Sequence, residues 1–149
     1  MVRGAAPGGQ SGAMSHPITS RMHGMLDYPV GIVLIAAPWI FGFSDADNSA
    51  AYLVPIIIGA LIIAQSLITD YELSVADVVP LRAHLMLDVL LGIVLAASPW
   101  IFGFSDEGVN AWLPHLIVGL GLIAAGLMTQ RDRETLPASP HVRRRHRAA

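Results

Sequence analysis

Two histidine–aspartate pairs are the residues of this sequence whose types and spacing could do chemistry. His23 precedes Asp27 by four residues, and His84 precedes Asp88 by the same interval. In a helix, residues four apart share a face, so each imidazole can reach its carboxylate. If the two pairs meet, two imidazoles and two carboxylates could form a divalent metal site, a proton relay or, through the imidazoles alone, a bis-histidine haem site.

The same four residues also have a structural interpretation. An aspartate near a helix N-terminus is stabilised by the helix dipole, and a histidine one turn earlier is a suitable hydrogen-bond partner. Ionisable groups near membrane interfaces are also commoner than functional sites inside the membrane. We therefore predict no cofactor, and we keep a metal or haem site at the two pairs as the alternative.

Both pairs open a segment that the chain contains twice. Each copy ends in Pro-Trp-Ile-Phe-Gly-Phe-Ser-Asp, at residues 38–45 and 99–106. Proline removes a backbone donor inside a helix, so Pro38 and Pro99 predict a kink. Trp39 and Trp100 are typical of the aromatic belt that lies at a membrane interface.

The composition indicates that lipid surrounds these segments. The chain is 54% hydrophobic and only 13% charged, which is unusual for a soluble protein of 149 residues. Segments 28–43, 50–69, 89–104 and 109–130 are nearly free of charge, and about 20 such residues cross a bilayer as a helix. The segments lack the alternating polarity of barrel strands. The absence of cysteine excludes thiol chemistry and Cys-ligated metal.

We therefore predict an all-α polytopic membrane protein with four transmembrane helices. Two helical hairpins, duplicated in parallel, should be related by a pseudo-twofold axis along the membrane normal. The first repeat is expected at 20–72, with spans at about 22–43 and 50–69, and the second at 80–130, with spans at about 82–104 and 110–129. Residues 73–79 form the linker, and the tails 1–19 and 131–149 are expected to be disordered.

Local signals predict where the helices of each repeat begin. The first helix should start at residues 18–20 with Thr19 or Ser20 as its cap, and the third at Pro80, because proline is tolerated at the first helical position. In the fourth helix, Gly119, Gly121 and Gly126 allow close backbone approach, which serves packing within the chain or a homodimer. His115 has no counterpart in the first repeat and is expected at the membrane interface.

The positive charges predict the topology. All nine lie on the side of the termini, whereas every charged residue of the two short hairpin loops is acidic. The positive-inside rule then predicts a protein of the cytoplasmic membrane with both termini in the cytoplasm. The basic C-terminal tail should meet anionic headgroups, and we predict no nucleic-acid partner because the basic run has no folded context.

The doubled Pro-Trp motif, preceded in each copy by the histidine–aspartate pair, resembles the SPW-repeat family of small bacterial and archaeal membrane proteins. The second copy has Ser98-Pro99-Trp100 intact, and the first has alanine at position 37 in place of the serine. The resemblance covers about residues 22–130. It implies four membrane helices and brings no established activity or catalytic residue to this chain.

No motif in the sequence completes an active site, since phosphate-binding glycine loops, zinc-protease helices and nucleotide fingerprints are missing. We predict a non-enzymatic integral membrane protein, a structural or accessory subunit in contact with the bilayer, as a homodimer or in a larger membrane complex. The first alternative is a metal-, haem- or proton-handling protein that uses the two pairs. The second is a small solute channel, for which the spans offer few further polar residues: Gln65, Ser66 and Ser98.

Overall fold

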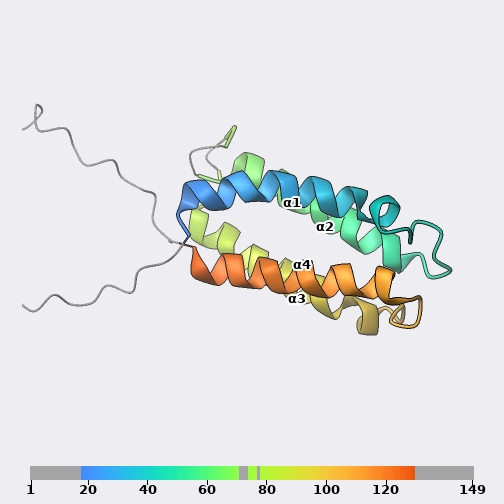
Figure 1. Ribbon diagram of the computed structural model, residues 1–149. Helices are drawn as coiled ribbons and strands as arrows, with labels where there is room; N and C mark the ends of the chain where they lie inside the picture. The colour runs from blue at the N-terminus through green and yellow to red at the C-terminus, as the bar shows by residue number, and fades with distance from the viewer. Residues whose placement is uncertain (1–17, 71–73, 77, 130–149) are drawn as a thin grey trace, which may run out of the picture.

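The described part of the chain forms four long helices, which Figure 1 shows packed into a bundle. The computed structural model describes residues 18–70, 74–76 and 78–129. The helices are α1 (Ser20–Ile40), α2 (Ala50–Ile68), α3 (Leu81–Ile101) and α4 (Val109–Met128). Each is long and apolar enough to cross a membrane. The predicted all-α class with four transmembrane helices is confirmed, while most of the two predicted disordered tails lies outside the described residues.

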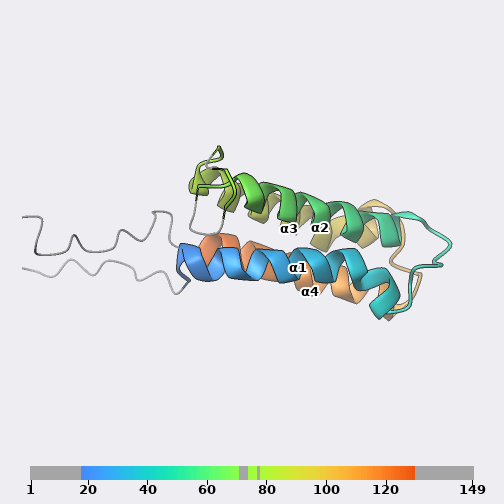
Figure 2. The ribbon, with the colours of Figure 1, turned by 90° about the horizontal axis from the view of Figure 1, so that it is seen from above.

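The helices form two hairpins, α1 with α2 and α3 with α4 (Figure 1). Seen from above, α1 lies beside α4 and α2 beside α3, so α1 and α3 occupy opposite corners of the bundle (Figure 2). The start of α1 and the end of α4 lie at the same end of the bundle, which we call the termini end. The α1–α2 and α3–α4 loops lie at the other, the hairpin end.

Glycine sets the close packing inside each hairpin. A Cβ atom at Gly31 would lie 2.9 Å from the carbonyl oxygen of Gly59, and one at Gly92 would lie 2.6 Å from that of Gly119. Backbones this close leave no room for a side chain. Gly119 therefore serves packing within the chain, whereas a Cβ at Gly121 would meet nothing within 4 Å.

The middle of the bundle is apolar. Its central cluster comes from all four helices and consists of Leu34, Ile58, Ile62, Leu95 and Leu122. In lipid, such side chains stabilise the bundle by close packing rather than by removal from water. Large apolar side chains also cover the outside of the helices, as Ile32 and Ile117 do at 60% exposure each. This outer surface suits contact with a lipid bilayer.

The helix ends follow most of the local signals. Thr19 caps α1 by accepting a hydrogen bond from the backbone N–H of Met22 at 3.2 Å, as predicted. The third helix begins one residue later than predicted, at Leu81, with Pro80 as its N-cap. The helix α1 continues past Pro38 to Ile40, and Figure 2 shows its last turn leaving the axis of the rest of the helix.

Glycines in the left-handed region end α1 and α3. Gly42 and Gly103 both have φ of 70°, a conformation that glycine adopts without steric cost. The predicted spans, to about 43 and 104, therefore run a few residues past the observed helix ends.

Polar contacts between the two repeats recur in pairs at both ends of the bundle. Ile18 pairs with Thr129 at the termini end, and Val79 pairs with Thr69. At the hairpin end, the Asn48 side chain donates to the carbonyl of Phe102 at 2.9 Å, and that of Asn110 to Phe41 at 3.1 Å. A pseudo-twofold relation would produce such pairs, and the axis itself stays a prediction.

Candidate functional site

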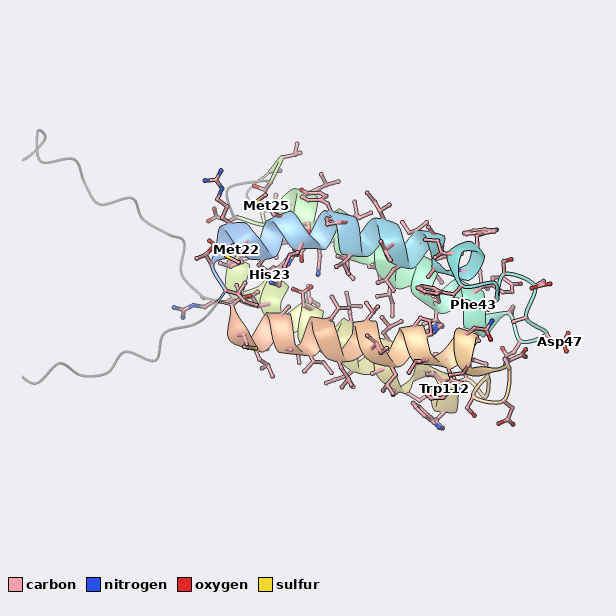
Figure 3. All side chains as sticks on the ribbon, viewed as in Figure 1. Met22, His23, Met25, Phe43, Asp47 and Trp112 are labelled. Atoms are coloured by element: carbon pink, nitrogen blue, oxygen red, sulfur yellow. The ribbon has the colours of Figure 1, made fainter. Side chains whose placement is uncertain are left out.

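The two histidine–aspartate pairs meet on the bundle axis near the termini end. His23 and Asp27 lie in the first two turns of α1, and His84 and Asp88 in those of α3. Because α1 and α3 face each other across the bundle, side chains on their inner faces converge, and Figure 3 shows His23 pointing inward. One ligand atom of each residue lies within 4.8 Å of the others. The sequence left this convergence open.

Each imidazole faces both carboxylates through its Nε2 atom. His23 Nε2 lies 2.8 Å from Asp88 Oδ2 and 3.3 Å from Asp27 Oδ1. His84 Nε2 lies 3.2 Å from Asp27 Oδ2 and 3.2 Å from Asp88 Oδ2. The contacts within a helix are those that the four-residue spacing predicts, and the contacts between helices join the two repeats.

All four side chains are buried. Asp27 is 4% exposed and Asp88 is 0% exposed. Two carboxylates removed from water carry a large desolvation cost unless positive charge lies beside them. Two imidazolium ions or one divalent cation would each neutralise the pair. The cluster is therefore a place where the chain can hold positive charge inside the bundle.

A threonine stands behind each imidazole. Thr129 Oγ1 lies 3.0 Å from Nδ1 of His23, and Thr69 Oγ1 lies 2.8 Å from Nδ1 of His84. Thr69 follows α2 and Thr129 follows α4, so each threonine contacts the histidine of the other repeat. Both hydroxyls also donate to the carbonyl four residues earlier, at 2.6 Å.

Two neighbouring residues of α2 hold the carboxylates. Gln65 Nε2 donates to Asp88 Oδ1 at 2.5 Å, and Ser66 Oγ donates to Asp27 Oδ2 at 3.0 Å. The matching positions in α4 are Ala125 and Gly126, which offer no side-chain donor. Each of the four cluster residues thus has a polar partner behind it, as ligands of metal sites usually do.

The geometry separates the ligands that the cluster could bind. A bis-histidine haem needs the porphyrin plane between the two Nε2 atoms, but carboxylate oxygens already lie within 3.3 Å of both. The residues present therefore do not fit a haem. A single metal ion needs no room for a porphyrin between the imidazoles. Two imidazole nitrogens and two carboxylate groups can therefore surround a small cation.

The family comparison covers this whole site. The family model of the SPW repeat domain matches residues 21–129. The chain belongs to the SPW repeat family. The matched region of this SPW repeat protein contains all four cluster residues and both Pro-Trp motifs. Comparison with curated proteins and with solved structures gives no match.

The Pro-Trp motifs of the SPW repeat protein lie at the hairpin end, away from the cluster. Trp39 is 65% exposed and Trp100 is 58% exposed. Rings that point out of the bundle near a helix end suit a membrane interface. Pro38 and Pro99 are buried where α1 and α3 end. These four residues shape the hairpin end and take no part in the histidine–aspartate site.

His115 lies at the hairpin end, but inside the bundle rather than at its lipid-facing surface. The side chain is 1% exposed, and its Nδ1 atom lies 2.7 Å from the carbonyl oxygen of Ala111. The loops after α1 and α3 fold Phe43 and Phe104 against it, with ring centroids 5.8 Å and 5.0 Å away. The two loops therefore cover the ring inside the bundle, and its position at the depth of the membrane interface stays a prediction.

Sequence reasoning missed the partners behind the cluster. Thr69 and Thr129 occupy matching places in the two repeats, as the histidines do, and that shared pattern was the available signal. In the sequence, Gln65 and Ser66 stand out only as polar residues that could line a channel, whereas in the structure both hydrogen-bond to cluster carboxylates. Ser98 donates to the carbonyl of Leu95 in its own helix. None of the three supports a polar path, since the apolar cluster fills the middle of the bundle.

Proposed function

We propose that this SPW repeat protein is a non-enzymatic integral membrane protein that binds a divalent metal cation through His23, Asp27, His84 and Asp88. One observation carries the proposal: four buried side chains bring one ligand atom each to within 4.8 Å of the others. Ionisable groups inside a membrane protein are costly, and they are commonly kept for function. A divalent cation would also balance the charge of the two carboxylates.

A structural or accessory subunit is the second candidate. This candidate is favoured because the cluster contacts join one repeat to the other: His23 of the first repeat contacts Asp88 of the second, and His84 contacts Asp27. A buried network of this kind can hold two hairpins in register without any ligand. Under this alternative, the partner would be a second copy of the chain or another membrane protein.

A metal-binding measurement on the purified full chain separates the two candidates. The chain is prepared in detergent, metal content is determined, and Zn²⁺ binding is titrated against a competing chelator. The wild type should bind one cation per chain, and His23→Gln/His84→Gln should bind none. His115→Gln is the matched control, because it removes a buried histidine from the other end of the bundle.

The titration can also reject the proposal. A wild-type chain that stays metal-free and gains no stability from added Zn²⁺, Mn²⁺ or Co²⁺ would leave the structural alternative in its place. Turnover of a substrate by the purified chain would overturn the non-enzymatic part.

The membrane placement is part of the same proposal. We place the protein in the cytoplasmic membrane with both termini in the cytoplasm, supported by the arginines near the termini end and the acidic hairpin loops. The cluster would then lie near the cytoplasmic face. A cation would enter and leave from the cytoplasm.

A further inference from the structure

The two threonines behind the cluster can only accept hydrogen bonds from the histidines. A hydroxyl has a single proton. Thr69 Oγ1 lies 2.6 Å from the carbonyl oxygen of Gln65, and Thr129 Oγ1 lies 2.6 Å from that of Ala125. Two oxygens approach this closely only with a proton between them, and a carbonyl has none to give. Each threonine hydroxyl therefore donates its only proton to the carbonyl oxygen four residues earlier.

The hydrogen on each imidazole then has a defined place. Nδ1 of His84 lies 2.8 Å from Thr69 Oγ1, and Nδ1 of His23 lies 3.0 Å from Thr129 Oγ1. Since both hydroxyls are acceptors toward these atoms, both Nδ1 atoms carry hydrogen. Without a cation, the 2.8 Å approach of His23 Nε2 to Asp88 Oδ2 also needs a proton between those two atoms. A bound cation releases that proton to water and takes its place. A neutral imidazole with hydrogen on Nδ1 then directs its Nε2 lone pair toward the carboxylates and the cation.

From this geometry we infer that Thr69 and Thr129 are positioning residues that aim both Nε2 lone pairs inward and make the cluster a four-coordinate site for a Zn²⁺-type cation. The inference rests on the proposed metal-binding function and names the class of cation. Thr69 and Thr129 do not touch the cation; they act through the tautomer and the orientation of the two imidazoles.

The ligand atoms lie close enough together for this cation class. A tetrahedral zinc site with bonds of about 2.0–2.1 Å has ligand atoms about 3.3 Å apart. Asp88 Oδ2 lies 2.8 Å from His23 Nε2 and 3.2 Å from His84 Nε2, and one ligand atom from each of the four residues lies within 4.8 Å of the others. Two imidazoles with two carboxylates suit Zn²⁺ and similar transition metals, whereas Ca²⁺ takes six to eight oxygen ligands. The cluster is therefore expected to bind Zn²⁺ and reject Ca²⁺.

The site depends on all four helices. The ligands come from α1 and α3, the carboxylate partners from α2, and the histidine partners from the residues that follow α2 and α4. Thr129 is the last described residue of the chain and contacts a ligand on the first helix. Loss of either threonine should therefore weaken the site although neither is a ligand.

The test compares valine and serine at the two threonines in the full chain. Valine keeps the shape and removes the acceptor, whereas serine keeps the hydroxyl. Thr69→Val and Thr129→Val should each weaken Zn²⁺ binding about 10–100-fold, the usual effect of losing a partner behind a metal ligand. Thr69→Ser and Thr129→Ser should retain wild-type affinity. Ca²⁺ should not compete for the site.

Nitrogen NMR of ¹⁵N-histidine-labelled wild type makes the test independent of whether the valine variants fold. With Zn²⁺ bound, His23 and His84 should show a protonated Nδ1 and a coordinated Nε2. Coordination through Nδ1, unchanged affinity in the folded valine variants, or competition by Ca²⁺ would overturn this inference alone. A wild type that binds no divalent cation would overturn the proposed function itself, so the two failures are distinguishable.

Discussion

The Nδ1 atom of His23 lies 3.0 Å from the hydroxyl oxygen of Thr129. These residues stand at opposite ends of the described chain, and their contact joins the first turn of α1 to the end of α4. His84 and Thr69 make the matching contact at 2.8 Å. Polar contacts therefore join the two repeats at the termini end of the bundle, whereas the middle of the bundle is apolar.

Breaking the cluster at Asp88 should destabilise the protein. Asp88→Asn removes a buried charge whose partners are His23, His84 and Gln65, and it should lower the free energy of unfolding by about 3–5 kcal/mol. Denaturant unfolding in detergent measures the change. Asp45→Asn, at an exposed hairpin position, is the control and should stay within about 0.5 kcal/mol of wild type. Equal small effects at both positions would show that the cluster does not hold the bundle together.

Cation removal should lower thermal stability. A ligand that binds only the folded state adds about 2.7 kcal/mol at a free concentration of one hundred times its Kd. Zn²⁺ should therefore raise the Tm of the wild type, and a chelator should reverse the rise. The Tm of His23→Gln/His84→Gln should not respond to either. A Tm that rises equally in wild type and variant would place the cation somewhere other than the cluster.

Alanine at two glycines should have opposite effects. At Gly92 a Cβ would lie 2.6 Å from the Gly119 carbonyl oxygen, so the two helices must separate, and Gly92→Ala should cost about 1–3 kcal/mol. At Gly121 the space is open, and alanine should raise helix stability by up to about 1 kcal/mol. Thermal unfolding in detergent compares the variants. A large loss at Gly121→Ala would indicate that a second copy of the chain packs on that face of α4.

The absence of native cysteine makes the topology directly measurable. Asp47→Cys places a thiol in the α1–α2 loop, and Ala76→Cys places one between α2 and α3; both positions are exposed. A membrane-impermeant maleimide added to intact cells should label position 47 and spare position 76 until the membrane is permeabilised. The reverse pattern would place the termini outside the cytoplasm and contradict the positive-inside prediction.

Much of the fold was predictable from local features of the chain. Four apolar runs of bilayer length specify four helices, since the backbone in lipid must satisfy its own hydrogen bonds. Thr19 was recognisable as a cap because capping depends on neighbours within one turn. The same locality predicted that His23 would lie near Asp27. The ends of α1 and α3 did not follow from these local signals, because proline and glycine at the hairpin end allow a helix to end at any of several residues.

The sequence by itself determined the membrane class, the duplicated hairpins and the two histidine–aspartate faces, because composition and helical periodicity act over a few turns. Only the tertiary structure decided that α1 and α3 face each other, that His23 meets Asp88, and that the two threonines stand behind the imidazoles. Those contacts depend on the rotation and depth of each helix relative to its neighbours. Close approach at Gly31–Gly59 and Gly92–Gly119 sets the register inside each hairpin, the Asn48 and Asn110 contacts join the two hairpins, and spacing along one helix specifies neither.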